Sequence, residues 1–138
     1  MFRREELMGK KTYAIFIGEL VVFYIPVKKL NDSVYGKDGK TPRELFEEFL
    51  MENFNAYTLE LSETDGFWRW DEISEIIHDK NARFEVSFQS EGNIDKFIDF
   101  ISEMCSLLDE EGIYTTLGSK SWLILPAGSK RRNFENEV

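Results

Sequence analysis

The sequence predicts an α+β fold in which two helices cover one face of a mainly antiparallel sheet. Apolar side chains recur every three or four residues in 42–53 and 94–110, which is the spacing of amphipathic helices. In 56–62 and 82–88 they recur at every second residue, which is the spacing of half-buried strands. A chain of 138 residues is long enough for one domain with a sizeable core, so we expect both element types to share it.

The first strand is expected in 13–25, YAIFIGELVVFYI, the most apolar run in the chain. Its apolar side chains occupy both parities, which predicts a central strand buried on both faces. Gly18-Glu19 is either a bulge or a tight turn within the run, and Pro26 ends it. Residues 1–11 carry mixed charges, and we expect them to be loose.

The first helix is expected to begin at a capping box. Thr41 is the N-cap, Pro42 suits the first helical position, and Glu44 completes the box. The preceding residues 27–40 indicate an exposed loop that looks like a phosphate-binding loop only superficially. The full motif requires a glycine where Val34 stands, so we reject nucleotide triphosphate hydrolysis as the function.

The clearest hairpin pattern covers 56–70, AYTLELSETDGFWRW. Asp65-Gly66 is a turn dipeptide, which predicts a turn at 63–66 between two strands. Trp68, Arg69 and Trp70 then lie together on the returning strand. Their rings and guanidinium either stack on a planar ligand or partner, or simply cover the sheet.

The second half of the chain predicts further strands around one long helix. Residues 71–80 are compatible with helix or strand, and we favour a short strand or an irregular extension. Asn93 is the expected N-cap of the second helix, and Gly112 its C-terminal stop. Short strands follow at 113–117 and 122–125, and a polar tail is expected over 127–138.

The resulting order of strand, helix, strand, strand, helix, strand resembles the ferredoxin-like α+β sandwich, with extra hairpin strands. The resemblance covers a single domain at 12–126 and lies in element order alone. It implies a fold and no activity, because this fold carries small-ligand regulators, RNA-binding modules and small enzymes.

Composition restricts the function further. The net charge of −9 repels phosphate backbones and disfavours direct nucleic-acid binding, and 82–88 lacks the basic aromatic motif of RNA-binding modules. The single cysteine, Cys105, indicates a reducing cytoplasm. The 13–25 run is too short to cross a membrane and contains Glu19.

The sequence points to no catalytic residue, cofactor or metal. His78 is the only histidine. Glu75, three residues before it, could share a metal ion with His78 only if the segment were a helix, so we interpret His78 as a surface side chain. Cys105 lies in the apolar stripe of the second helix and is expected to behave as a small hydrophobic residue.

Acidic stripes on both helices give the leading functional hypothesis, which is a non-enzymatic regulatory or inhibitory module that binds a protein partner, for example a basic one. Each stripe repeats at spacing four: Glu44, Glu48 and Glu52 on the first helix, Asp95, Asp99 and Glu103 on the second, continued by Glu110. One alternative is a nucleotide-like ligand bound at the tryptophans, and a second is a small enzyme.

A homodimer is also expected, because two helices leave one face of the sheet open. Aromatic residues are enriched in interface cores, so the expected contributors are Phe16, Phe23, Trp68 and Trp70.

Overall fold

The computed structural model describes residues 13–88 and 91–128. The expected loose segment 1–11 lies outside these residues, as does all but the start of the expected tail 127–138. The elements are β1 (Glu19–Pro26), α2 (Val27–Leu30), a 3₁₀ turn (Ser33–Tyr35), α3 (Pro42–Phe54), β2 (Thr58–Trp68), β3 (Ile77–Phe88), α4 (Glu91–Leu107), β4 (Ile113–Leu117) and β5 (Lys120–Ile124).

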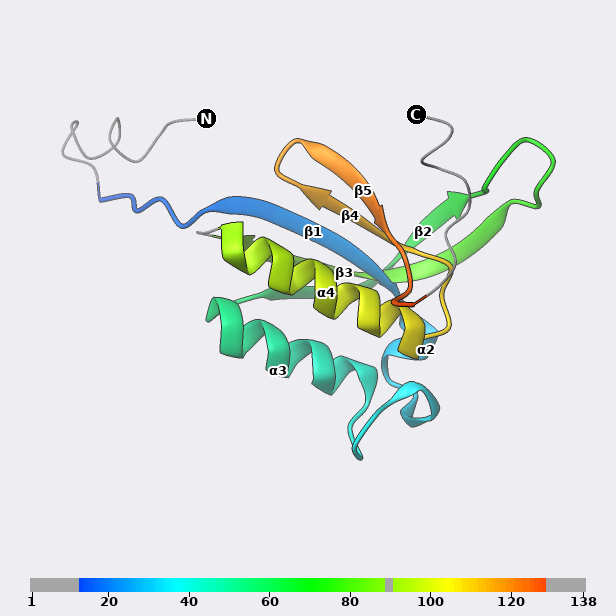
Figure 1. The fold of residues 1–138 in the computed structure, drawn as a ribbon, viewed down its shortest axis with the longest axis horizontal. Coiled ribbons are helices and arrows are strands. Elements are labelled where there is room, and N and C mark those ends of the chain that lie inside the picture. The colour runs from blue at the N-terminus through cyan, green and yellow to red at the C-terminus, as the bar shows by residue number, and fades with distance from the viewer. Residues whose placement is uncertain (1–12, 89–90, 129–138) are drawn as a thin grey trace.

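Across the described residues the strands form one five-stranded antiparallel sheet in the order β2-β3-β1-β4-β5. β1 is central, as its two-sided apolar pattern predicts, and pairs with β3 on one side and β4 on the other. α3 and α4 lie side by side on one face of the sheet (Figure 1). The predicted α+β class is confirmed, and β5 is the additional edge strand.

The core fills the space between the sheet and these helices. Phe23 of β1 stacks on Phe84 of β3 with ring centroids 4.8 Å apart, and Phe46 of α3 lies 5.3 Å from Phe84. Phe97 of α4 meets Phe23 edge-on at 5.4 Å. All four rings are fully buried, because alternate residues of the strands and one stripe of each helix face this layer.

The predicted start of α3 is confirmed. The Thr41 side chain accepts a hydrogen bond from the Glu44 backbone N–H, and the Glu44 carboxylate accepts one from the Thr41 N–H at 3.0 Å. The helix ends at Asn55, whose left-handed φ of 64° lets its N–H bond to the Met51 carbonyl.

The predicted turn at 63–66 is wrong. β2 continues through these residues, with an irregular register between Glu60 and Thr64, and the chain reverses at 69–76 instead. The Asp65 carboxylate contacts His78 Nε2 at 2.8 Å and accepts a hydrogen bond from Lys80 Nζ at 3.0 Å, both across the ladder. The ladder pairing of Thr64–Trp68 with Ile77–Asn81 keeps Asp65-Gly66 in an extended strand. β3 accordingly begins at Ile77 and includes the end of the undecided 71–80 segment.

The limits of two other elements also differ from expectation. Gly18 has a φ of 121°, and β1 begins only after it, so 13–18 forms no part of the sheet. α4 begins at Glu91, so Asn93 lies within the helix and is not its N-cap. Its C-terminal reversal falls at Asp109, with a φ of 54°, and not at Gly112.

Candidate functional site

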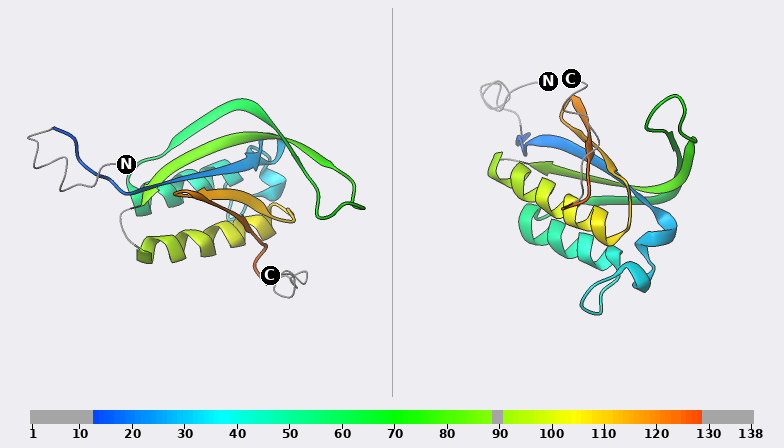
Figure 2. Two further views of the ribbon diagram at one scale, coloured as in Figure 1. Left: turned by 90° about the horizontal axis from the view of Figure 1, so that it is seen from above. Right: turned by 45° about the vertical axis from the view of Figure 1, so that its right-hand side comes forward.

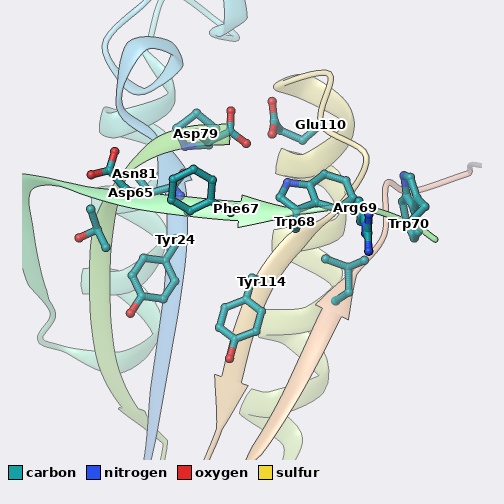
Figure 3. A pocket seen from close by; sticks show the side chains of 15 residues that line it. Tyr24, Asp65, Phe67, Trp68, Arg69, Trp70, Asp79, Asn81, Glu110 and Tyr114 are labelled. Carbon is teal, nitrogen blue, oxygen red and sulfur yellow. The ribbon is translucent and has the colours of Figure 1, made fainter. Parts of the chain in front are cut away.

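The β2–β3 hairpin and the β4–β5 hairpin are separate from one another in Figure 2. A cavity of about 550 Å³ opens between them, on the sheet face opposite the helices (Figure 3). Its position follows from strand parity, because the residues of β1, β3 and β4 that do not face the helices point to this side. Its aromatic lining is Tyr24, Phe67, Trp68, Trp70 and Tyr114, and its carboxyl groups are Asp65, Asp79 and Glu110.

The aromatic walls are held by contacts between elements distant in sequence. Tyr24 of β1 and Tyr114 of β4 have ring centroids 6.0 Å apart, and Trp68 meets Trp70 edge-on at 5.3 Å. Trp70 Nε1 donates a hydrogen bond of 2.7 Å to Glu111 Oε2 in the α4–β4 connection. This bond ties the 69–76 reversal to the opposite side of the cavity.

Glu110 brings a partly buried carboxylate to the cavity. Lys29 Nζ donates to Glu110 Oε2 at 2.5 Å and to the Leu108 carbonyl oxygen at 2.8 Å, so it joins α2 to the end of α4. Burial raises the pKa of Glu110, Lys29 opposes this rise, and the carboxylates of Asp79 and Asp109 add to it.

The pKa of Lys29 is also raised, but by a different cause. Burial alone would lower its pKa, but the hydrogen bond and the charge of Glu110 outweigh this, and the net direction is upward. The pair is therefore an ammonium and a carboxylate that depend on one another for their charge. In Figure 3 the Asp79 and Glu110 carboxyl groups point toward each other beside Trp68.

The structure brings the sequence-predicted Trp68, Arg69 and Trp70 together at this cavity. It places the acidic stripes elsewhere, on α3 and α4, which cover the other face of the sheet (Figure 1). All six predicted stripe residues are exposed: Glu44, Glu48, Glu52, Asp95, Asp99 and Glu103. Of these, Glu48 forms an ion pair with Lys40. Recognition of a basic protein by these stripes stays a prediction.

Sequence reasoning missed Tyr24, Asp79, Tyr114 and Glu110 as site residues. Tyr24, Asp79 and Tyr114 stand at strand positions that alternate with core residues, so strand parity was the signal that pointed to the open face. Glu110 was interpreted as a continuation of the acidic stripe. It lies beyond the helix and is paired with Lys29, which no local pattern indicates.

His78 and Cys105, the two residues considered above for catalysis or metal binding, lie in contrasting environments. His78 is exposed on β3 as expected for a surface side chain, and its ring stacks on Phe67 at 4.4 Å. Within the described residues no group of three side chains is placed to hold a metal. Cys105 is fully buried, and burial raises the pKa of its thiol to about 12.

The expected contributors to a homodimer are only partly suited to that role. Phe23 is fully buried against the helices and is wrong as an interface residue, because its position on β1 has core parity. Trp68 and Trp70 line the cavity. The homodimer itself stays a prediction.

Among the helices that the structure describes, none combines the length and apolar character needed to cross a membrane.

Comparison with known proteins gives similarity of structure without similarity of sequence. No family model matches the chain, and no curated protein matches it in sequence. A solved phage SAM lyase in complex with S-methyl-5'-thioadenosine superposes with a TM-score of 0.53 at 9% identity, covering 82% of this chain and 93% of that one. A phage SAM lyase in the apo state gives 0.53 at 7% identity, covering 86% and 98%. At such identities the likeness establishes the fold.

The comparison corrects the leading functional hypothesis. We expected a non-enzymatic regulatory or inhibitory module and leaned against an enzyme. The solved structures that share nearly the whole fold are those of a lyase, which is an enzyme, so this expectation is wrong. The small enzyme, which the sequence left as a second alternative, is taken up as a proposal below.

Proposed function

We propose that this protein is a small enzyme that binds S-adenosylmethionine, or a closely similar adenosyl sulfonium, in the cavity and breaks one of its carbon–sulfur bonds. The observation that carries the proposal is the cavity lining, in which the aromatic residues Tyr24, Trp68, Trp70 and Tyr114 occur together with the carboxyl groups of Asp79 and Glu110. The fold shared with phage SAM lyase supports it.

The lining suits the two chemical features of such a ligand. Adenine is planar and apolar on its faces, so it stacks on aromatic rings such as those of Trp68 and Trp70. A sulfonium carries a positive charge, which aromatic faces and carboxylates both attract. The volume of about 550 Å³ lies within the roughly 300–1,000 Å³ typical of small-molecule sites.

The bond that breaks is inferred by comparing S-adenosylmethionine with S-methyl-5'-thioadenosine, the ligand in the solved phage SAM lyase. S-methyl-5'-thioadenosine is S-adenosylmethionine without its aminobutyrate chain, so the bond that breaks joins sulfur to Cγ of that chain. The electron pair stays on sulfur, which becomes a neutral thioether. The chain closes its own carboxylate onto Cγ to give a lactone, or it loses a Cβ proton to a carboxylate such as Asp79 and gains a double bond.

The cavity favours either route for the same electrostatic reason. The positive charge on sulfur disappears as the bond breaks, and the negative charge that balances it disappears as well. An aromatic lining destabilises separated charges more than it destabilises a transition state in which they cancel. The aromatic residues therefore contribute to the rate as well as to binding.

Turnover is tested by incubating the purified protein with S-adenosylmethionine and measuring S-methyl-5'-thioadenosine by liquid chromatography. We expect product, and Trp68→Ala should weaken substrate binding by roughly two- to thirtyfold, the range that a cation–aromatic contact supplies. Trp122→Ala is the matched control, because Trp122 is exposed on β5 and does not line the cavity. The four-carbon product, lactone or alkene, identifies the route.

Two results would refute the proposal. One is the absence of both binding and product at millimolar S-adenosylmethionine. The other is an equal effect of the Trp68 and Trp122 changes, which would move the site away from the cavity.

The proposed location is the cytoplasm, where a lone free cysteine stays reduced.

A further inference from the structure

We propose that Lys29 is a positioning residue that keeps Glu110 ionised at the wall of the cavity, so that the site selects a positively charged ligand over its neutral thioether. This inference rests on the proposed function. It concerns how the site distinguishes substrate from product, and it assigns a role to an ion pair that the bond-breaking step does not use.

The Lys29–Glu110 ion pair joins two elements and is largely buried. Lys29 approaches Glu110 from α2, and its ammonium also donates to the carbonyl oxygen of Leu108 at the end of α4. Only a small part of each charged side chain is exposed, 16% for Lys29 and 14% for Glu110. The pair is thus shielded from solvent, and its two members are fixed to different elements.

Glu110 has another carboxylate close to it besides the ammonium of Lys29. Asp79 projects from β3 toward Glu110, so two carboxyl groups face one another in the cavity (Figure 3). Repulsion between them favours protonation of Glu110, as does burial. Lys29 opposes both effects. The ionisable groups next to Glu110 or lining the same cavity are Lys29, Asp79, Asp109, Cys105, Tyr24, Asp65, Arg69 and Tyr114.

The consequence is a site whose affinity depends on ligand charge. An ionised Glu110 attracts the sulfonium or the ammonium of S-adenosylmethionine, whereas S-methyl-5'-thioadenosine has neither charge. Loss of the positive charge therefore weakens binding as soon as the bond is broken, and the neutral product leaves. A protonated Glu110 would bind the two molecules more nearly alike.

The first experiment measures dissociation constants of S-adenosylmethionine and S-methyl-5'-thioadenosine by stopped-flow tryptophan fluorescence, which records binding at Trp68 and Trp70 before the substrate is consumed. At a pH between the Glu110 pKa values of wild type and of Lys29→Met, the preference for the cation should be about tenfold or more weaker in Lys29→Met, where Glu110 is protonated, and in Glu110→Gln, which carries no charge, than in wild type. Lys29→Arg, which keeps the charge, should retain it. Lys40→Met removes the exposed Lys40–Glu48 pair on the other face and is the matched control.

The second experiment needs no adenosyl ligand. Carbon-13 NMR of the carboxyl groups should show a higher pKa for Glu110 in Lys29→Met than in wild type. The cation preference of wild type should decline as the pH falls through the Glu110 pKa, since protonation removes the negative charge. In Lys29→Met the same decline should begin at a higher pH.

The outcomes separate the possibilities. If Lys29→Met and Glu110→Gln weaken both ligands equally, the pair only supports the end of α4 and the inference is wrong. An unchanged Glu110 pKa in Lys29→Met overturns it as well. If wild type binds neither ligand, the proposed function fails, while the carboxyl titration still decides the role of Lys29. Glu110→Gln keeps Lys29 in place and serves if Lys29→Met does not fold.

Discussion

Cys105 should be almost unreactive in the native protein, by an amount that follows from its pKa. Its side chain is fully buried on α4, and its Sγ donates to the Glu110 carbonyl oxygen at 3.3 Å. At pH 8 a thiol with a pKa of about 12 is ionised in roughly one molecule in ten thousand, against roughly one in ten at the ordinary value of 9.0. Because only the thiolate reacts, labelling should be slowed about a thousandfold before steric exclusion is counted.

The assay follows the release of coloured nitrothiobenzoate from Ellman's reagent at pH 8, with and without denaturing urea. Cys105→Ala is the blank, because Cys105 is the only cysteine in the chain. A native rate within about tenfold of the rate in urea would show that the thiol reaches solvent, and the reasoning from burial would then be wrong.

The same shift in pKa predicts how stability depends on pH. The thiol ionises less readily in the folded state than in the unfolded state, so ionisation favours unfolding. The contribution of Cys105 to stability is complete below about pH 9 and declines as the pH rises toward 12. Urea denaturation of wild type should show an alkaline decline in stability, and the decline should be smaller in Cys105→Ala, in which groups with a raised pKa such as Lys29 still titrate.

Two further predictions concern the core and the start of α3. Phe46→Ala should lower the free energy of unfolding by about 3–5 kcal/mol in urea denaturation, because a fully buried ring is replaced by a cavity; a loss below about 1 kcal/mol would contradict the packing. Thr41→Ala should cost about 1 kcal/mol by removing the helix cap, and Thr41→Ser should restore most of it. Equal stability of the two Thr41 variants would show that the hydroxyl does not act as the cap.

The sequence predicted elements well where the signal was local. The capping box at Thr41 and the alternation in 82–88 each depend on neighbouring residues, and both are confirmed. It failed where a local preference was outweighed by partners distant in sequence. Asp65-Gly66 favours a turn, but the ladder pairing of Thr64–Trp68 with Ile77–Asn81 keeps it within a strand.

The candidate site was only partly predictable for a related reason. Trp68, Arg69 and Trp70 are adjacent in sequence, so their cluster was visible before the fold was known. Tyr24 and Tyr114 are distant in sequence and meet only because β1 and β4 are neighbours in the sheet. The function inferred from the acidic stripes was wrong, because composition describes the surface and does not locate a cavity.

By itself the sequence determined the α+β class, the helix at about 42–53 and the central position of β1, because periodicity and capping act over a few residues. Only the tertiary structure decided that Lys29 meets Glu110, that Asp79 faces the same carboxylate, and that aromatic residues from β1, β2 and β4 enclose one cavity. These contacts join residues up to 81 positions apart, and their existence depends on strand order and register, which local patterns do not encode.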